Sequence, residues 1–345
     1  MLDTSPSLYG GEKTVLTRPL LIGQFSSHPD FTITPDTCNR RHLIQDHKTT
    51  FNLSEGFESF STKDPRLYWN DIHPLQEWAI SERKMYDCED YYELFREAEI
   101  VCCRGVLTTI AKTPYYEHDA WRIIAVRRNG IIYLHDCGAT DGRTFFVRDD
   151  RHAHQTYYGH KFHRMMTSAD GKQHVGDISV DCRETFHSVF RSDLILPDES
   201  RIKLSYSAEI KAVDENNVFV DFKTHPTHNN RGENLVKGDR WLSRGWFWWL
   251  QAHLVGVDRI FVGFKSDDGS VREIKTVKRT ELQKRTKIPN ECDVVMKFLA
   301  TVLSEVKKQC VDFLQIRYTP KELKVQFEPA TCDTNFLLSE FKSYR

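Results

Sequence analysis

The chain has 345 residues, and its 48 Lys and Arg residues nearly balance 49 Asp and Glu residues, so the formal net charge is −1. This length allows one large domain or two ordinary ones. The balanced charge excludes a global basic field, so any surface for nucleic acid must be a local groove. The nine cysteines include no C-x-x-C pair. They therefore offer no zinc or disulfide framework and favour a reducing compartment.

The expected compartment follows from two further segments. The N-terminus, residues 1–7, lacks the positive patch and apolar core of a signal peptide. The most apolar window, residues 246–257, is too short for a membrane span and contains Gln251 and His253. We therefore expect a soluble protein of the nucleus or the cytosol that is neither secreted nor inserted in a membrane.

Residues 1–65 are rich in Ser, Thr, Pro, Asp and His and show weak periodicity, so we expect them to wrap irregularly over a core formed by residues 66–345. In chain order, the predicted elements of this core are a helix at 87–99, strands at 121–127 and 130–136, a loop and helix start at 143–162, a strand or helix at 185–194, strands at 206–213 and 218–224, a helix at 243–255, a strand at 259–264, a helix at 292–308 and strands at 313–318 and 323–327. Because strands and helices interleave without a linker or repeat, we predict one mixed α/β domain.

The two predicted strands on either side of a turn at 214–217 carry the most informative charges. Glu209 and Lys211 lie on the first strand, and Asp221 and Lys223 lie on the second. Side chains two residues apart share a face of a strand, so each acid lies beside its lysine. Carboxylates beside a lysine can support metal-assisted phosphodiester chemistry, in which the acids hold a cation and the lysine orients water or offsets phosphate charge.

The same charges are also compatible with ordinary cross-strand ion pairs, each worth a fraction of a kcal/mol. The register decides between these interpretations. A two-residue turn would place Ile210 opposite Asp221. A three-residue turn would place Glu209 there, whereas a five-residue turn spanning 214–218 would place Lys211 there. Taken alone, the hairpin favours the ion-pair interpretation.

Other polar residues stand in apolar surroundings. Arg104 interrupts an apolar run, and a buried guanidinium needs a carboxylate or phosphate, although a structural ion pair would satisfy it equally well. Gln251 lies on an aromatic helix, where it either satisfies a backbone group or faces a cleft. The histidines of 152–160 fit no zinc signature, so we expect them to lie in a solvated loop.

Six spaced blocks match one family pattern in the correct order. They are Cys103-Arg104-Gly105-x-Leu107-Thr108 with Thr113-Pro114-Tyr115 and Trp121, Tyr158–His163 in place of Gly-Tyr-Lys-Phe-Glu, Phe186–Ser192, Ala208–Lys211 in place of Glu-x-Asp, Asp221–Thr224 in place of Glu-x-Lys, and Trp249–Phe264. Together these blocks cover roughly residues 90–310 and resemble the DXO decapping exoribonuclease family.

The resemblance implies two mixed β-sheets flanked by helices, related to the acid-acid-x-Lys nucleases, with an active-site cleft between the sheets. It implies metal-dependent removal of incomplete, unmethylated or nicotinamide-adenine caps from RNA, often followed by 5′–3′ degradation. The implied cofactor is a divalent cation, Mg²⁺ or Mn²⁺. The implied partners are a capped or phosphorylated RNA 5′ end and a protein such as a 5′–3′ exoribonuclease.

Residue by residue, the resemblance assigns catalysis to Glu209, Asp221 and Lys223. It assigns substrate contacts to Arg104 and Gly105, which would meet the 5′ phosphate or cap, to Gln251 near the attacking water, and to Glu209 and Lys223. The implied metal ligands are Glu209, Asp221 and Phe222, together with two positions that are occupied here by His163 and Lys211. Asp221 replaces a glutamate of the family pattern with a shorter carboxylate.

Relative to the family pattern, the residues at 163 and 211 are expected to weaken the metal site. His163 replaces a glutamate, and a neutral imidazole brings no negative charge and suits magnesium poorly. Lys211 replaces an aspartate, so a ligand is lost and a cation repels the metal. Two unit charges about 4 Å apart interact by about 4 kcal/mol at surface-like screening, and a divalent ion doubles that energy.

Two functions are therefore expected. The first is an RNA 5′-end decapping nuclease whose catalysis is weakened at His163 and Lys211. The second is an inactive relative that binds RNA 5′ ends or a protein partner. A DNA-directed nuclease of the wider acid-acid-x-Lys class shares the hairpin but leaves the blocks at Arg104 and Gln251 unexplained.

Overall fold

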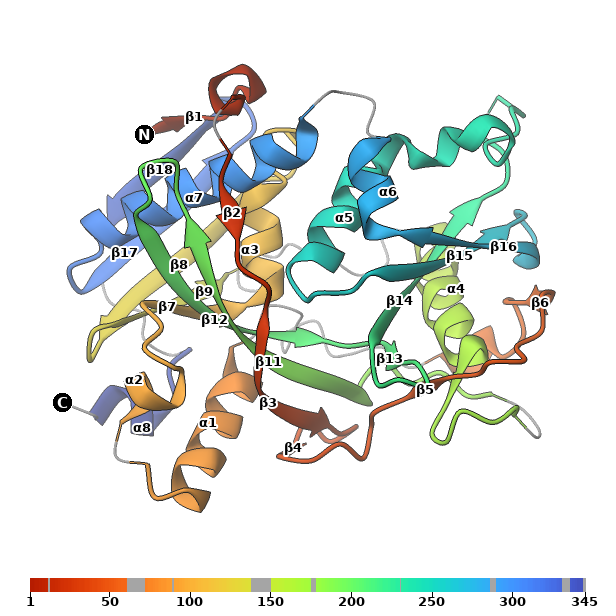
Figure 1. Cartoon of the computed structure of the whole chain (residues 1–345), viewed down its shortest axis with the longest axis horizontal. Helices are drawn as coiled ribbons and strands as arrows, with labels where there is room; N and C mark the ends of the chain where they lie inside the picture. Colours follow the sequence, from red (N-terminus) through yellow and green to blue (C-terminus); the bar gives the residue numbers. More distant parts are fainter. Residues whose placement is uncertain are drawn as a thin grey trace.

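The computed structural model describes residues 1–345 except 12, 61–71, 89, 138–149, 175–177, 230, 286–289, 331–335 and 344–345. Its strands form two mixed sheets, one of eleven strands and one of seven, with helices packed on both of them (Figure 1). The predicted mixed α/β fold with two flanked sheets is confirmed.

The large sheet has the order β1-β18-β17-β8-β9-β7-β12-β11-β3-β4, and β2 also pairs with β11. Around β7 the neighbours β9 and β12 run parallel, whereas the other pairs are antiparallel. The strand bounds are β1 (Leu2–Asp3), β2 (Val15–Leu16), β3 (Leu20–Ser27), β4 (Ile33–Thr34), β7 (Ile100–Cys103), β8 (Trp121–Arg128), β9 (Ile131–Asp136), β11 (Thr185–Ile195), β12 (Arg201–Glu209), β17 (Phe313–Thr319) and β18 (Lys324–Pro329).

The small sheet has the order β10-β5-β13-β14-β15-β16-β6. Its central strands β14 and β15 run parallel, and α5 lies between them in the sequence. The strand bounds are β5 (His42–Leu43), β6 (Phe51–Asn52), β10 (Thr167–Ser168), β13 (Ala212–Val213), β14 (Phe219–Pro226), β15 (Arg259–Lys265) and β16 (Ser270–Lys278).

Three hydrophobic cores hold the helices against the two sheets. One core joins the large sheet to α1 (His73–Met85), α2 (Tyr91–Leu94) and α8 (Ser339–Ser343). The largest core lies between the sheets and contains α3 (Arg104–Ala111), α5 (Gly245–His253), α7 (Glu291–Gln309) and Leu282 of α6 (Arg279–Lys284). The third core packs α4 (Asp150–Met166) on the outer face of the small sheet. None of the helices in the described ranges has the length and apolarity that a membrane span requires.

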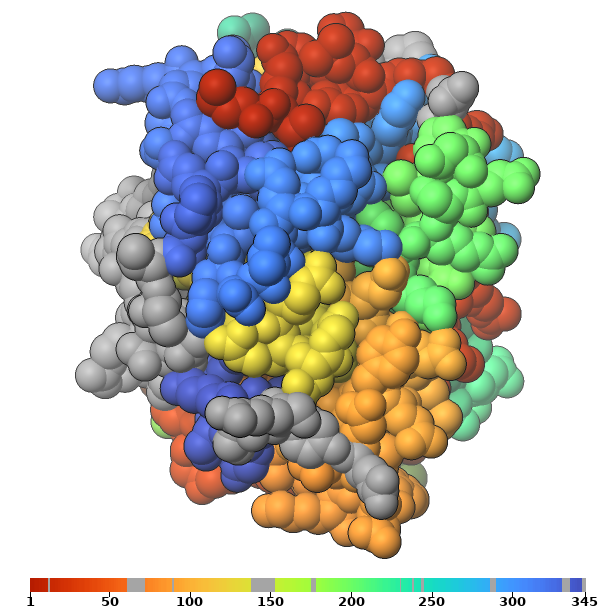
Figure 2. All heavy atoms as spheres, turned by 90° about the vertical axis from the view of Figure 1, so that its left-hand side faces the viewer, coloured from red at the N-terminus to blue at the C-terminus, as the bar shows by residue number. Residues whose placement is uncertain are grey.

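The first 60 residues, expected as an irregular wrap, contribute strands to both sheets, and β3 lies between β11 and β4. They also include two 3₁₀ helices, η1 (Pro6–Tyr9) and η2 (Phe57–Ser59), and a third, η4 (Lys237–Arg244), precedes α5. Because β1 pairs with β18, the first residues of the chain lie beside a strand near its C-terminal end in the large sheet. Figure 2 shows the first residues, in red, lying against the C-terminal segments in blue.

Two local predictions are corrected, and one open alternative is resolved. The helix expected at 87–99 is reduced to α2, because Arg96 and Glu97 adopt left-handed φ values of 53° and 59°. The ambiguous segment 185–194 is strand β11. The histidines of 152–160 lie on α4 and not in a solvated loop, and His154 stacks on Phe57 with ring centroids 3.8 Å apart.

Candidate functional site at the junction of the sheets

The predicted catalytic residues gather where the chain crosses from the large sheet to the small sheet. Strand β12 ends at Glu209, and β13 begins at Ala212 in the other sheet. Ile210 anchors the crossing, because it is buried and its N–H donates to the carbonyl of Phe186 at 2.8 Å. Lys211 follows, and its Nζ lies 2.7 Å from Oε1 of Glu209.

The hairpin after this crossing has the five-residue turn, because Ala212 pairs with Val220. Continued by one residue, this register places Lys211 opposite Asp221. Glu209 belongs to the large sheet, where it pairs with His187 of β11. The two carboxylates are therefore not cross-strand neighbours in one hairpin, and a lysine lies between them.

Asp221 and Lys223 lie on the face of β14 that is turned toward the layer between the sheets. The alternate residues Val220 and Phe222 belong to the core with α4 on the opposite face. Lys223 Nζ lies 3.0 Å from Asp221 Oδ2 and donates to Oε1 of Gln251 on α5 at 2.9 Å. One lysine thus links the strand acid to the helix amide.

The environment of Asp221 is strongly positive. Its side chain is buried, and burial alone would raise the pKa of Asp221. The neighbouring charge and hydrogen bond of Lys223, with a smaller effect of Arg104, instead bring this pKa below its ordinary value. The carboxylate is consequently ionised and already satisfied by cations.

Arg104 begins α3 directly after β7, which runs parallel to β12. Its charge acts on both Asp221 and the buried hydroxyl of Tyr206, so it lies near the same junction. Among the described residues its guanidinium has no hydrogen-bond acceptor. No side-chain hydrogen bond caps the N-terminus of α3, where Gly105 is the second residue. The free backbone N–H groups of this first turn and the helix dipole add to the positive potential.

His163 contacts the site through the backbone carbonyl of Lys211. Its Nε2 lies 2.7 Å from the carbonyl oxygen of Lys211, and its ring packs on Phe222 at 5.5 Å. Burial lowers the pKa of His163 well below its usual value, and the charges of Lys211 and Arg41 lower it further. The ring is therefore neutral and must donate its Nε2 proton to the carbonyl, so this nitrogen is not offered to a metal.

The described side chains do not fit a divalent metal. They contain no group of three or more His, Cys, Asp and Glu residues that could hold one. Each acid of the site is instead paired with a lysine, at 2.7 Å for Glu209 and 3.0 Å for Asp221. With Arg104 added, three positive side chains face two negative ones, which favours an anion such as phosphate.

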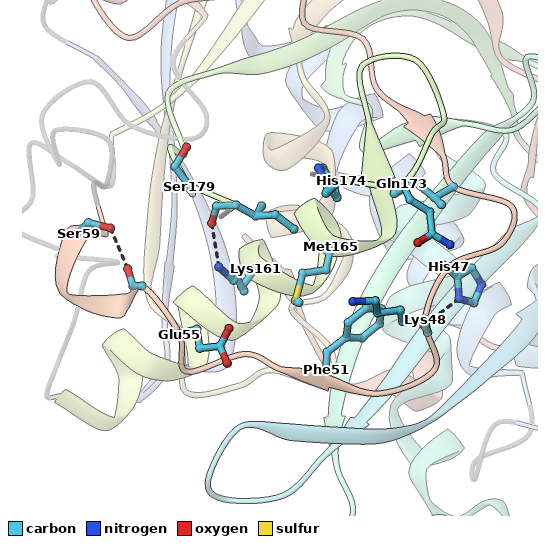
Figure 3. Close-up of a pocket in the computed structure, with 13 residues that line it drawn as sticks. His47, Lys48, Phe51, Glu55, Ser59, Lys161, Met165, Gln173, His174 and Ser179 are labelled. Carbon is cyan, nitrogen blue, oxygen red and sulfur yellow. Dashed lines mark hydrogen bonds between the residues drawn. The ribbon is translucent and has the colours of Figure 1, made fainter. Parts of the chain in front are cut away.

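A cavity of about 620 Å³ lies elsewhere, between the N-terminal segment, α4 and the segment after β10. Figure 3 shows Lys161, Met165 and Phe51 among the residues that line it, and Lys161 Nζ donates to the carbonyl of Ile178 at 2.8 Å. None of the residues predicted for the site lines this cavity.

Arg41 is a site neighbour that the sequence analysis missed. Its guanidinium donates to Oγ1 and the carbonyl of Thr167 at 2.8 and 2.7 Å, and its charge reaches His163. Burial lowers the pKa of Arg41 to about 10. It lies in a segment without periodicity, so only the adjacent pair Arg40-Arg41 marked it.

Comparison with known proteins gives a family match over residues 17–342 to the RAI1-like PD-(D/E)XK nucleases. The chain is 30% identical over 243 residues to the decapping nuclease dom-3 of Caenorhabditis elegans, covering 68% of this chain and 59% of the nematode protein. It is 27% identical over 328 residues to the human decapping and exoribonuclease protein, covering 88% of this chain and 78% of the human protein.

Solved structures share the fold. Scheffersomyces stipitis Rai1, solved with (3′-NADP)⁺ and calcium, has a TM-score of 0.79 at 16% identity, over 100% of this chain and 99% of that one. Candida albicans Rai1, solved with pU5 and Mn²⁺, has a TM-score of 0.78 at 18% identity, with the same coverage. The chain therefore belongs to the family of RAI1-like PD-(D/E)XK nucleases, whose named relatives are decapping nucleases and exoribonucleases.

Proposed function

We propose that this protein binds capped or phosphorylated RNA 5′ ends and that its metal-dependent hydrolysis is weakened at Lys211 and His163. The observation that carries the proposal is the 2.7 Å ion pair between Lys211 and Glu209. This pair puts a cation beside a carboxylate that the metal would need. A phosphate oxygen, in contrast, gains charge-assisted hydrogen bonds from the same cation.

Each remaining residue has a role in this proposal. Arg104 and the uncapped first turn of α3 receive the 5′ phosphate, because a guanidinium matches phosphate geometry. Lys223, held between Asp221 and Gln251, contacts the next phosphate oxygen. Incomplete, unmethylated and nicotinamide-adenine caps are the proposed cap classes.

A fully inactive binding protein is the second candidate. It is favoured by the lack of a group of three metal-ligating side chains among the residues that the structure describes. In this case the site would hold an RNA end without any turnover, even in manganese.

Turnover separates the two candidates. The protein is incubated with 5′-triphosphate, unmethylated-cap and nicotinamide-capped RNA in Mg²⁺ and then in Mn²⁺, beside the double variant Lys211→Asp, His163→Glu. We expect slow cleavage by the wild type and faster cleavage by the double variant. Complete inactivity of the wild type beside an active variant would select the inactive candidate, and equally fast cleavage in Mg²⁺ would contradict both.

Binding is measured separately with a chelator present, by fluorescence anisotropy of labelled 5′-phosphorylated RNA. We expect Arg104→Ala to weaken binding by about ten-fold or more, because a hydrogen bond to a charged group is worth about 1.5–3 kcal/mol. The matched control is Arg272→Ala, which removes an exposed arginine from β16. Equal affinity of the two variants would refute the role of Arg104.

A further inference from the structure

A second cavity, of about 1040 Å³, begins one residue beyond Lys223. Its floor is formed by residues 224–227 at the end of β14, and α5 forms one wall. Phe247, which lines it, lies four residues before Gln251, so both residues share a face of α5 about 6 Å apart along the axis. His225, which also lines the cavity, shares a face of β14 with Lys223, so the cavity adjoins the candidate site at the carboxyl ends of the parallel strands β14 and β15.

Three partly exposed aromatic rings line this cavity: Tyr116, Phe247 and Trp248. The rings of Tyr116 and Phe247 lie 5.5 Å apart. Trp248 is supported by Trp241 at 5.9 Å and by His225 at 6.1 Å. Because neighbours hold these rings in place, their remaining faces are suited to receive flat, unpaired ligand rings.

The rim of the cavity is positive. Its charged lining residues are Arg231 and Arg240 at the rim and the buried Lys265, against a single acid, Asp267. Both arginines are exposed, and Arg240 approaches an acid only at 3.6 Å, from Glu233. Aromatic rings interleaved with basic side chains form the surface that single-stranded nucleic acid prefers.

We propose that this aromatic groove, defined by Tyr116, Phe247, Trp248, Arg231 and Arg240, holds the nucleotides that follow the leading one in single-stranded RNA. The proposal rests on the proposed function, since it extends the strand whose 5′ phosphate meets Arg104. The second and third bases stack on Phe247 and Trp248, and the phosphates between them lie near the two arginines. A duplex cannot present its base faces, so the groove selects unpaired 5′ ends.

The test uses 5′-phosphorylated oligoadenylates of one to five nucleotides with chelator present. We expect the affinity of the wild type to rise by about ten-fold or more from one nucleotide to three. Trp248→Ala should lose about ten-fold for the trinucleotide and nothing for the mononucleotide, whereas Trp248→Phe should keep the gain. Tyr86→Ala, which removes an exposed aromatic ring elsewhere, is the matched control and should change neither affinity.

A second measurement does not depend on the fold of a tryptophan variant. Arg231 is exposed, so Arg231→Gln keeps the core intact, and it should reduce the slope of log affinity against log salt by about 0.7. Affinity that is independent of length in the wild type would overturn the groove, while mononucleotide binding lost with Arg104→Ala would still support the proposed function. Length-dependent binding that Arg104→Ala leaves unchanged would instead refute the proposed function.

Discussion

Replacing Lys211 with aspartate should raise the metal affinity of the site above that of the wild-type chain. The Lys211 ammonium lies 2.7 Å from Glu209 Oε1, so a metal ligated by that carboxylate would lie close to the ammonium. At a separation of about 4 Å and surface-like screening, a divalent ion and this ammonium repel each other by about 8 kcal/mol. The lysine is about a quarter exposed, at 24%, and can move, so much of this repulsion is relieved. Even a quarter of it, about 2 kcal/mol, is a roughly thirty-fold change in Kd.

The assay is a manganese titration followed by electron paramagnetic resonance, which measures the free ion. Lys172→Asp is the matched control, because Lys172 is also paired with an acid two residues before it, Asp170 at 3.4 Å, on an exposed surface. Both variants change the charge by the same amount, so long-range effects cancel. If Lys211→Asp binds manganese no more tightly than Lys172→Asp, the ammonium is not what excludes the metal.

Two further predictions concern stability. Burial and then the charge of Arg279 lower the pKa of His253 to about 4. The unfolded chain therefore binds a proton at a higher pH than the folded protein does. The free energy of unfolding should consequently fall by roughly 3 kcal/mol as the pH drops from about 6.5 to about 4. His253→Gln should flatten this range in urea unfolding, whereas the exposed His118→Gln should not. Asp214 is buried, accepts the N–H groups of Asn216 and Val218 at 2.9 Å and pairs with Arg259, so Asp214→Ala should lower the free energy of unfolding by about 3 kcal/mol. A loss below about 0.5 kcal/mol would mean that this carboxylate does not hold the turn.

The sequence predicted elements whose signals are local. The hairpin of β8 and β9 follows from Asn129-Gly130, which both adopt the positive φ that its tight turn requires. The long helix α7 follows from its apolar periodicity. The strand predicted at 206–213 is broken at 210–211, where the chain passes from one sheet to the other. The β propensity of these residues suits either sheet, so only tertiary pairing determines which sheet each residue joins.

In the candidate site, too, the sequence predicted the local features but not those that depend on tertiary structure. The pairing of Asp221 with Lys223 follows from the alternation of side chains within β14, whereas Lys211 meets Glu209 although the strand is broken between them. The register that places Lys211 opposite Asp221 depended on turn length, which the polar residues of the turn did not determine. The approach of Arg104 to Asp221 joins two segments that no local pattern relates, so it was accessible only through the family resemblance.

His163 and Lys211, where the family resemblance implies two acids, are in direct contact with each other. His163 is held by the carbonyl of Lys211, a contact that a glutamate at position 163 cannot make, because an ionised carboxylate has no proton to donate. Lys211 in turn neutralises Glu209, which would otherwise lie near Asp221 as a second negative charge at the junction. In the proposed function, the charge balance that a cation would have supplied is thus supplied by the protein itself. In this proposal, the positive charge of Arg104, Lys211 and Lys223 exceeds the negative charge of Glu209 and Asp221, and this excess receives the phosphate.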